Sequence, residues 1–170
     1  MRIEHATDPS EAALAIAREY GVAFTTQDDF PFSEIESYRK NLGLEWIKRT
    51  YPIKHILESG VKLALSTDAP ATAWGDPSDP LINIMFAVTR KAYDGTDCGI
   101  EQAIDVQTAV ELYTREAAEV TGFHDLGKLK EGYKANFTVL NKDIFEVEAE
   151  SIKDIRIEKT YIKGECVFEK

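Results

Sequence analysis

The chain has 170 residues, of which 44% are hydrophobic and 29% are charged, and its formal net charge is −10. This composition is that of a soluble globular protein long enough for one domain with a sizeable core. The acidic balance argues against nucleic acid or an anionic membrane as a partner, because both require a basic face. The two cysteines, Cys98 and Cys166, show no metal or redox spacing. We therefore expect reduced thiols and a cytoplasmic location.

Short β-prone segments alternate with helical segments in the first part of the chain. Residues 2–6, 22–26 and 61–66 have the apolar character of buried strands. A helix is predicted from Asp8, as its N-cap, to the glycine at position 21, and a shorter one over residues 52–60. The pattern Ser-Glu-Ile-Glu at 33–36 resembles a capping box and predicts a further helical segment through Trp46. This alternation predicts parallel βαβ units.

Two more helices are expected after the third strand. A loop with Trp74, Gly75 and Asp76 leads to Asp79-Pro80, which predicts a helix that runs to about residue 92. Thr108 as a cap and Glu111 as its capping-box partner predict another helix, which ends at residue 122.

The character of the chain changes after residue 122. A turn-rich stretch is followed by a predicted strand over 135–140 and a predicted hairpin around Lys163-Gly164. We therefore expect two parts, an α/β part over 1–122 and a small β part over 123–170.

Two strand ends carry side chains suited to metal chemistry. Leu63-Ala64-Leu65 is an apolar run that leads to Ser66-Thr67-Asp68 and then to a proline, and Ile3-Glu4 leads to His5. In an α/β barrel the C-terminal ends of the strands face the active site. A divalent metal lowers the pKa of a bound water to about 7, and a carboxylate beside it can take the proton. Asp68 suits that role, and His5 suits the role of a neutral imidazole ligand.

Simpler interpretations exist for each of these residues. Asp68, before Ala-Pro, could simply cap a turn and have no other role. His5 could be an ordinary polar residue near a chain end. Catalytic zinc usually has three protein ligands, and these two residues do not complete a site. His55, inside a predicted helix, and His124, after a helix end, are expected to be structural or solvated.

The order of motifs resembles the C-terminal portion of the amidohydrolase superfamily, and within it the family-3, YtcJ-like branch, some members of which are described as exoenzyme-regulatory proteins. The resemblance covers almost the whole chain. It is carried by Ile3-Glu4-His5-Ala6, Gly21-Val22, Gln27, Tyr51-Pro52, Ser59-Gly60-Val61, Ser66-Thr67-Asp68-Ala69-Pro70, Asp79-Pro80-Leu81, Ala87-Val88-Thr89-Arg90, Gly127-Lys128-Leu129 and Phe137-Thr138-Val139-Leu140.

The resemblance implies a (β/α)8 TIM barrel beside a small β-sandwich, with hydrolysis of C–N bonds in a small-molecule substrate by one or two divalent metal ions, often zinc. Residues 1–122 would then supply about strands six to eight of the barrel with their helices, and residues 123–170 the closing strands of the sandwich. His5 would be the metal ligand after strand six, and Asp68 the metal ligand and general base after strand eight. Gln27 would face the substrate pocket from the end of strand seven.

Several family motifs are missing from this sequence. The His-x-His pair after strand one, the bridging residue of strand four and the histidine of strand five are absent. The resemblance therefore implies a fragment, inactive by itself, that lacks strands one to five. Open sheet edges promote association, so we expect a homo-oligomer or association with the missing N-terminal half.

Two other hypotheses remain open. The chain could be a non-catalytic regulatory or binding module that retains the amidohydrolase scaffold. It could also be an unrelated α/β protein in which Asp68 caps a turn, which would require the ordered series of motifs to be a coincidence. An upstream reading frame that encodes His-x-His would favour the cut enzyme over the module.

Overall fold

The computed structural model describes residues 1–70 and 78–170, which form a mixed α/β fold with two three-stranded sheets. The first sheet contains β1 (Arg2–Ile3), β2 (Ala23–Thr26) and β3 (Leu63–Leu65) in the order β1-β2-β3. All of its pairings are parallel, and Phe24 is opposite Ile3 on one side and Leu63 on the other. This confirms the predicted βαβ arrangement of the first part of the chain.

Helix α1 (Glu11–Tyr20) connects β1 to β2. Its N-cap is Ser10, whose side chain accepts a hydrogen bond from the backbone N–H of Ala13 at 3.2 Å. The prediction of Asp8 as the cap was therefore wrong, because the cap lies two residues later, at Ser10, which has the extended backbone that a cap requires. Gly21 ends the helix at φ 64°, as predicted.

The connection from β2 to β3 consists of four short helices: α2 (Asp29–Ser33), α3 (Ile35–Asn41), α4 (Leu44–Arg49) and α5 (Ile53–Glu58). The predicted capping box at 33–36 does not form. Ser33 is already the last residue of α2, and Glu34, the N-cap of α3, makes no side-chain capping bond. Gly43, at φ 83°, separates α3 from α4, so the helical segment through Trp46 is interrupted.

Helix α6 (Pro80–Thr89) begins as predicted, because Asp79 accepts a hydrogen bond from the Leu81 N–H at 2.9 Å. It ends before residue 92, since Arg90 adopts a left-handed conformation with φ 52°. A 3-10 turn, η1 (Ile100–Gln102), follows. The predicted loop with Trp74, Gly75 and Asp76 lies outside the described residues.

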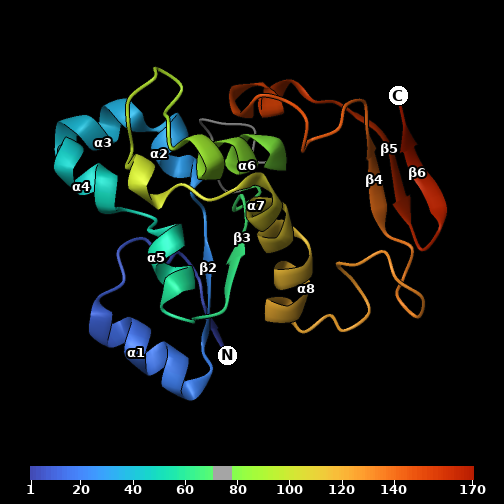
Figure 1. Ribbon diagram of the computed structural model, residues 1–170, viewed down its shortest axis with the longest axis horizontal. Coiled ribbons are helices and arrows are strands. Elements are labelled where there is room, and N and C mark those ends of the chain that lie inside the picture. Colours follow the sequence, from blue (N-terminus) through green and yellow to red (C-terminus); the bar gives the residue numbers. More distant parts are fainter. Residues whose placement is uncertain (71–77) are drawn as a thin grey trace.

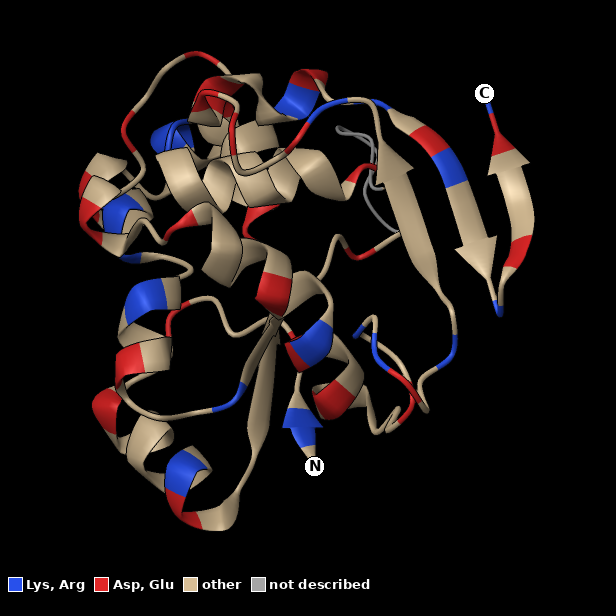
Figure 2. Cartoon of the chain, turned by 45° about the vertical axis from the view of Figure 1, so that its right-hand side comes forward, with Lys and Arg blue, Asp and Glu red and all other residues tan. Residues whose placement is uncertain are grey.

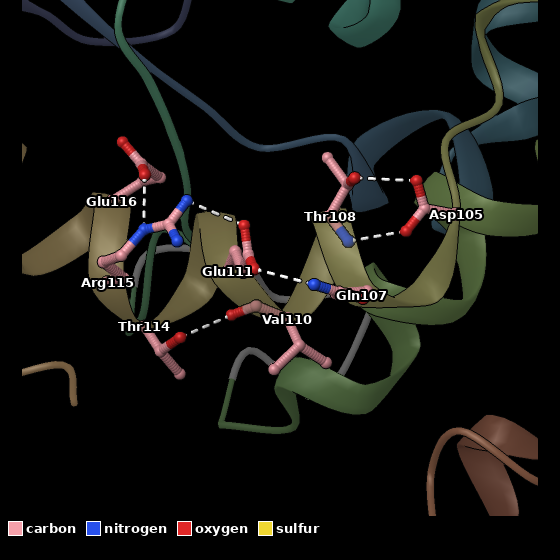
Figure 3. Close-up of polar contacts among 8 residues, drawn as sticks. All are labelled: Asp105, Gln107, Thr108, Val110, Glu111, Thr114, Arg115 and Glu116. Atoms are coloured by element: carbon pink, nitrogen blue, oxygen red, sulfur yellow. Dashed lines mark hydrogen bonds and ion pairs between the residues drawn. The ribbon is translucent and has the colours of Figure 1, made fainter. Parts of the chain in front are cut away.

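The second predicted helix is two helices, α7 (Val106–Tyr113) and α8 (Arg115–Thr121), separated at Thr114. Figure 3 shows that Asp105 caps α7, where its carboxylate accepts from the Thr108 N–H at 2.8 Å and from the Thr108 hydroxyl at 2.7 Å. Thr108 was therefore wrongly predicted as the cap. It already lies inside the first turn, and the extended backbone belongs to Asp105.

The last part of the chain contains β4 (Phe137–Leu140), the 3-10 helix η2 (Ala149–Asp154), β5 (Ile157–Ile162) and β6 (Glu165–Glu169). These strands form an antiparallel sheet, and the β5–β6 hairpin turns at Lys163-Gly164 as predicted. Figure 1 shows this sheet at one side of the molecule, beyond α6 to α8. In Figure 2 an acidic and a basic residue are adjacent on β5, namely Glu158 and Lys159, and β6 has an acidic residue at each end, Glu165 and Glu169.

The main core is formed between the first sheet and its helices. Helix α5 packs on one side of β3, and α7 and α8 pack on the other (Figure 1). Ile144, Ile152 and Ile155, which follow β4, belong to the same buried cluster as Leu63 and Leu112. Residues on both sides of position 122 therefore share one core, and the division into 1–122 and 123–170 stays a prediction. Within the described ranges, no helix is long and apolar enough to cross a membrane.

Candidate metal and substrate site

The three parallel strands place His5, Gln27 and Asp68 along one edge of the first sheet. Each residue follows the C-terminal end of its strand, and strands that run in parallel end at the same edge. His5 and Asp68 have positive backbone φ angles, 58° and 57°. This conformation costs free energy in a non-glycine residue and is concentrated at functional sites.

His5 and Asp68 come together across the sheet. The Nε2 atom of His5 lies 4.0 Å from Oδ2 of Asp68, and the two side chains are 51% and 34% exposed. The ring of Phe30 lies beside the imidazole at a centroid distance of 6.4 Å and an interplanar angle of 27°. The pair is therefore accessible from solvent and has an aromatic wall on one side.

Gln27 points across the sheet edge and is only 2% exposed. Its Nε2 atom donates a hydrogen bond to the Ser66 hydroxyl at 2.7 Å, two residues before Asp68. Its Oε1 atom is buried and has no hydrogen-bond partner in the part of the chain that the structure describes. The side chain thus links the ends of β2 and β3 and keeps one acceptor free.

A cavity of about 590 Å³ adjoins the three strand ends. His5, Gln27 and Asp68 all contribute to its wall. The remaining lining is mostly polar or small, and it includes Arg2, Glu4, Thr25, Ser66, Thr67, Ala117 and Thr121. A volume of this size is in the range of small-molecule sites.

A buried polar cluster behind the strand ends was not assigned from the sequence. Asn83, on α6, is 1% exposed, and its Nδ2 atom lies within hydrogen-bonding distance of Asp29 Oδ1 at 2.9 Å, Asp28 Oδ1 at 3.2 Å and the Ser66 carbonyl at 3.2 Å. Burial raises the pKa of Asp28 to about 7 and that of Asp29 to about 6. The run Gln27-Asp28-Asp29 at a strand end was the available signal, but nothing local indicates which distant side chain meets it.

Arg90 lies near this cluster and is fully buried. Its terminal nitrogens donate to the backbone oxygens of Tyr51 at 3.1 Å and of Thr50 and Cys98 at 2.8 Å. Its positive charge lowers the pKa of Asp28 and so opposes part of the effect of burial. Arg90 therefore joins the chain before α5 to the end of α6.

The described residues do not supply a complete metal site. They contain no group of three or more His, Cys, Asp or Glu side chains placed to hold one ion. His55 is outside the site, since its Nε2 atom lies 2.6 Å from Glu11 Oε1. His5 and Asp68 have the right atoms, and a small movement would allow both to reach one ion at about 2 Å. The pair can therefore supply two ligands to a metal ion, one imidazole nitrogen and one carboxylate oxygen.

Comparison with known proteins defines the class of this protein. The amidohydrolase family model matches residues 1–168, and the chain belongs to that family. The predicted resemblance is thereby confirmed.

Two individual proteins of known sequence are similar to this chain. YtcJ of Bacillus subtilis is 31% identical over 99% of this chain and 32% of its own length. An N-substituted formamide deformylase of Arthrobacter pascens is 22% identical over the whole chain and 31% of its own length. The chain therefore spans about a third of the length of these relatives.

Solved structures agree with the fold. A metal-dependent hydrolase of Pyrococcus horikoshii covers 87% of this chain with a TM-score of 0.73 and 28% identity, and 30% of that structure is matched. The zinc complex of the atrazine chlorohydrolase TrzN of Arthrobacter aurescens covers 99% of this chain with a TM-score of 0.68 and 20% identity, over 36% of its own length. Similarity at the latter level supports the fold alone.

Proposed function

We propose that this chain is the C-terminal part of a metal-dependent amidohydrolase that hydrolyses a non-peptide C–N bond in a small molecule. In this proposal β1, β2 and β3 are strands six, seven and eight of a (β/α)8 barrel. Residues 123–170 contribute the last strands of a β-sandwich. The approach of His5 and Asp68 to 4.0 Å at the ends of two such strands is the observation that carries the proposal.

The roles of the three site residues follow from their chemistry and place. A divalent ion, which we expect to be zinc, would activate a water molecule and polarise the substrate carbonyl. His5, as a neutral imidazole, would hold the ion through Nε2. Asp68 would contact the ion as well, accept the proton from the attacking water and pass it to the leaving nitrogen. Gln27 would offer its unpaired Oε1 atom to an N–H group of the substrate, because that acceptor is buried beside the cavity.

The isolated chain would be inactive in this proposal, because His5 and Asp68 alone do not complete the metal site. Completion would require association with the N-terminal half of the enzyme, or with another copy of the chain. Such association would also cover the exposed β1 edge, where Arg2 and Ile3 are both solvent-accessible. The two free cysteines support a reducing compartment such as the cytoplasm.

The test is to read the coding sequence upstream of residue 1 for an in-frame His-x-His and to express the extended protein. Zinc content and hydrolysis of N-substituted formamides and of other small amides would be measured. Asp68→Asn should lower kcat at least about 100-fold, as expected when proton transfer is lost. Asp125→Asn, a matched change at an exposed ion pair with Lys134, should leave kcat unchanged. Robust metal-dependent activity from the 170 residues alone would overturn the fragment hypothesis.

The second candidate function is a regulatory or binding module without catalysis. The incomplete metal-ligand set of the described residues favours it over an enzyme complete in itself. A native translation start at Met1, with no upstream His-x-His, would support this candidate and count against the first.

A further inference from the structure

The side-chain amide nitrogen of Asn83 lies within hydrogen-bonding distance of more acceptors than it has hydrogens to donate. Its Nδ2 atom faces Asp28 Oδ1, Asp29 Oδ1 and the Ser66 carbonyl oxygen at 3.2, 2.9 and 3.2 Å. A side-chain amide has two N–H hydrogens. One of the three acceptors must therefore share a hydrogen or do without one.

The two carboxyl groups in this cluster are deeply buried. Asp28 is 0% exposed and Asp29 is 7% exposed, and both approach the same nitrogen atom. The second oxygen of Asp28, Oδ2, is buried with no hydrogen-bond partner among residues 1–70 and 78–170. Each carboxyl also has a hydrogen bond with the backbone, which lowers its pKa, but burial has the larger effect. Two adjacent buried carboxylates are unfavourable in a site of low polarity, whereas a pair that retains one proton is less so.

We propose that Asn83 is a positioning residue for Asp68, and that it holds the end of β3 fully only while the Asp28–Asp29 pair retains a proton. The role of Asp68 in this statement rests on the function proposed above. The link to Asp68 is the Ser66 carbonyl, which lies two residues earlier in the chain and accepts from Asn83.

Loss of the shared proton redistributes the hydrogen bonds of Asn83. With one carboxyl neutral, the amide directs one hydrogen to the remaining carboxylate and the other to the Ser66 carbonyl. With both ionised, both hydrogens are drawn to the carboxylates, because hydrogen bonds to charged acceptors are stronger than those to neutral ones. The Ser66 carbonyl then loses its bond to α6, and the segment that leads to Asp68 is held less firmly.

Other charged groups face the pair from each packed element. Arg90, after α6, lowers the pKa of Asp28, while Asp29 raises it. Asp68, after β3, raises the pKa of Asp29. The phenol of Tyr113 on α7 interacts electrostatically with both carboxyls and with Asp79. Burial outweighs the effect of Arg90, so the balance favours retention of a proton near neutral pH.

The test is an NMR titration of the 170-residue chain between pH 4.5 and 8.5, without metal. The carboxyl carbons of Asp28 and Asp29 report protonation, and the carbonyl carbon of Ser66 reports its hydrogen bond. In the wild type we expect the Ser66 signal to shift with the same midpoint as the last carboxyl of the pair, well above the ordinary value for aspartate. In Asp28→Asn, whose amide stays neutral, that shift of Ser66 should be lost.

Two further variants test whether the hydrogen bond of Asn83, and not packing alone, links the carboxyl pair to Ser66. Asn83→Ala should leave a high titration midpoint for the pair but uncouple the Ser66 signal from it. If that variant does not fold, Asp28→Asn decides the question. Asp125→Asn should reproduce the wild-type titration.

Two results would overturn the inference: both carboxyls already fully ionised at pH 4.5, or a Ser66 response that persists in Asp28→Asn. The latter would point to Asp68 itself as its source. Because no metal or substrate is present, failure here would leave the proposed hydrolase function standing.

Discussion

The imidazole Nε2 of His5 and the carboxylate Oδ2 of Asp68 lie 4.0 Å apart, although the two residues follow the first and third strands of the sheet. β2 lies between those strands, so the two side chains must reach toward each other across β2. Both residues reach this arrangement through positive φ angles at the strand ends. The backbone strain and the convergence occur at the same two positions, which supports the assignment of the site.

The pair should bind zinc only weakly in the isolated chain. Two protein donors leave the ion short of the three ligands typical of catalytic zinc, so we expect a dissociation constant no lower than the micromolar range, about −8 kcal/mol. Asp68→Ala and His5→Ala should each weaken even this binding. Competition against a chromophoric chelator measures the affinity, and His55→Ala serves as the control because its imidazole contacts Glu11 instead. Nanomolar binding that needs both residues would show that another ligand is supplied, for example by a second copy.

The free energy of unfolding should fall as the pH rises, because the buried carboxyl group of Asp28 loses its proton. Its pKa is raised from an ordinary value near 4 to about 7 in the folded chain, so the folded state binds the proton more tightly than the unfolded state. The resulting stabilisation is complete below pH 4 and is lost as the pH rises through about 7. Asp28→Asn removes this titration and should flatten the decline in stability between pH 4 and 7 by about 1–4 kcal/mol. Urea denaturation at pH 5 and pH 8 measures the free energy of unfolding at each pH. An equal change in that free energy between the two pH values for variant and wild type would contradict the prediction.

Arg90 should be among the most sensitive positions for stability. Its guanidinium donates to three buried backbone oxygens, those of Thr50, Tyr51 and Cys98. Replacement by methionine, which keeps much of the volume, would remove the guanidinium donor from the oxygens of Thr50 and Cys98, whereas the Tyr51 oxygen would still accept from the Ile53 N–H at 2.8 Å. Because each buried acceptor that loses its donor costs about 1–3 kcal/mol, we expect a loss of at least about 2 kcal/mol. Chemical denaturation measures the loss, and Arg39→Met, at an exposed ion pair with Asp94, should cost about 1 kcal/mol or less.

Gly99 and Gly95 form a matched pair in the loop after α6. Both have positive φ angles, 95° and 85°. A Cβ atom at Gly99 would collide with the backbone carbonyl oxygen of Lys48, whereas one at Gly95 would meet nothing within 4 Å. Gly95→Ala should therefore cost only the backbone strain, about 1–2 kcal/mol. Gly99→Ala should cost about 1–3 kcal/mol more, because a backbone atom must move. Equal melting temperatures for the two variants would refute the predicted collision.

Much of the architecture could be predicted from local patterns. The three short apolar segments, the glycine that ends α1, the Asp79-Pro80 start of α6 and the hairpin at Lys163-Gly164 all formed as expected. These features depend on residues within a few positions of one another, through backbone conformation and the burial of alternating side chains. The family could also be predicted, because the order of its motifs is itself a property of the sequence.

Helix starts were harder to predict, because several neighbouring residues were able to cap each helix. Asp8 and Ser10 are both good capping residues, and so are Asp105 and Thr108. The residue that caps is the one with an extended backbone where the helix begins, and tertiary packing decides this. Packing also divided the predicted helix at Thr114 and ended α6 at Arg90, whose guanidinium binds distant carbonyls.

The sequence by itself identified His5 and Asp68 as candidates, from their residue types at strand ends, and it identified Gln27 through the family resemblance. Only the tertiary structure decided that His5 meets Asp68, that Gln27 binds Ser66, and that Asn83 lies between two buried aspartates. The physical reason is the separation along the chain of the residues that interact. Strand and helix patterns arise from interactions between near neighbours in the chain, whereas the charge state and hydrogen bonds of a buried side chain depend on residues brought together from distant elements.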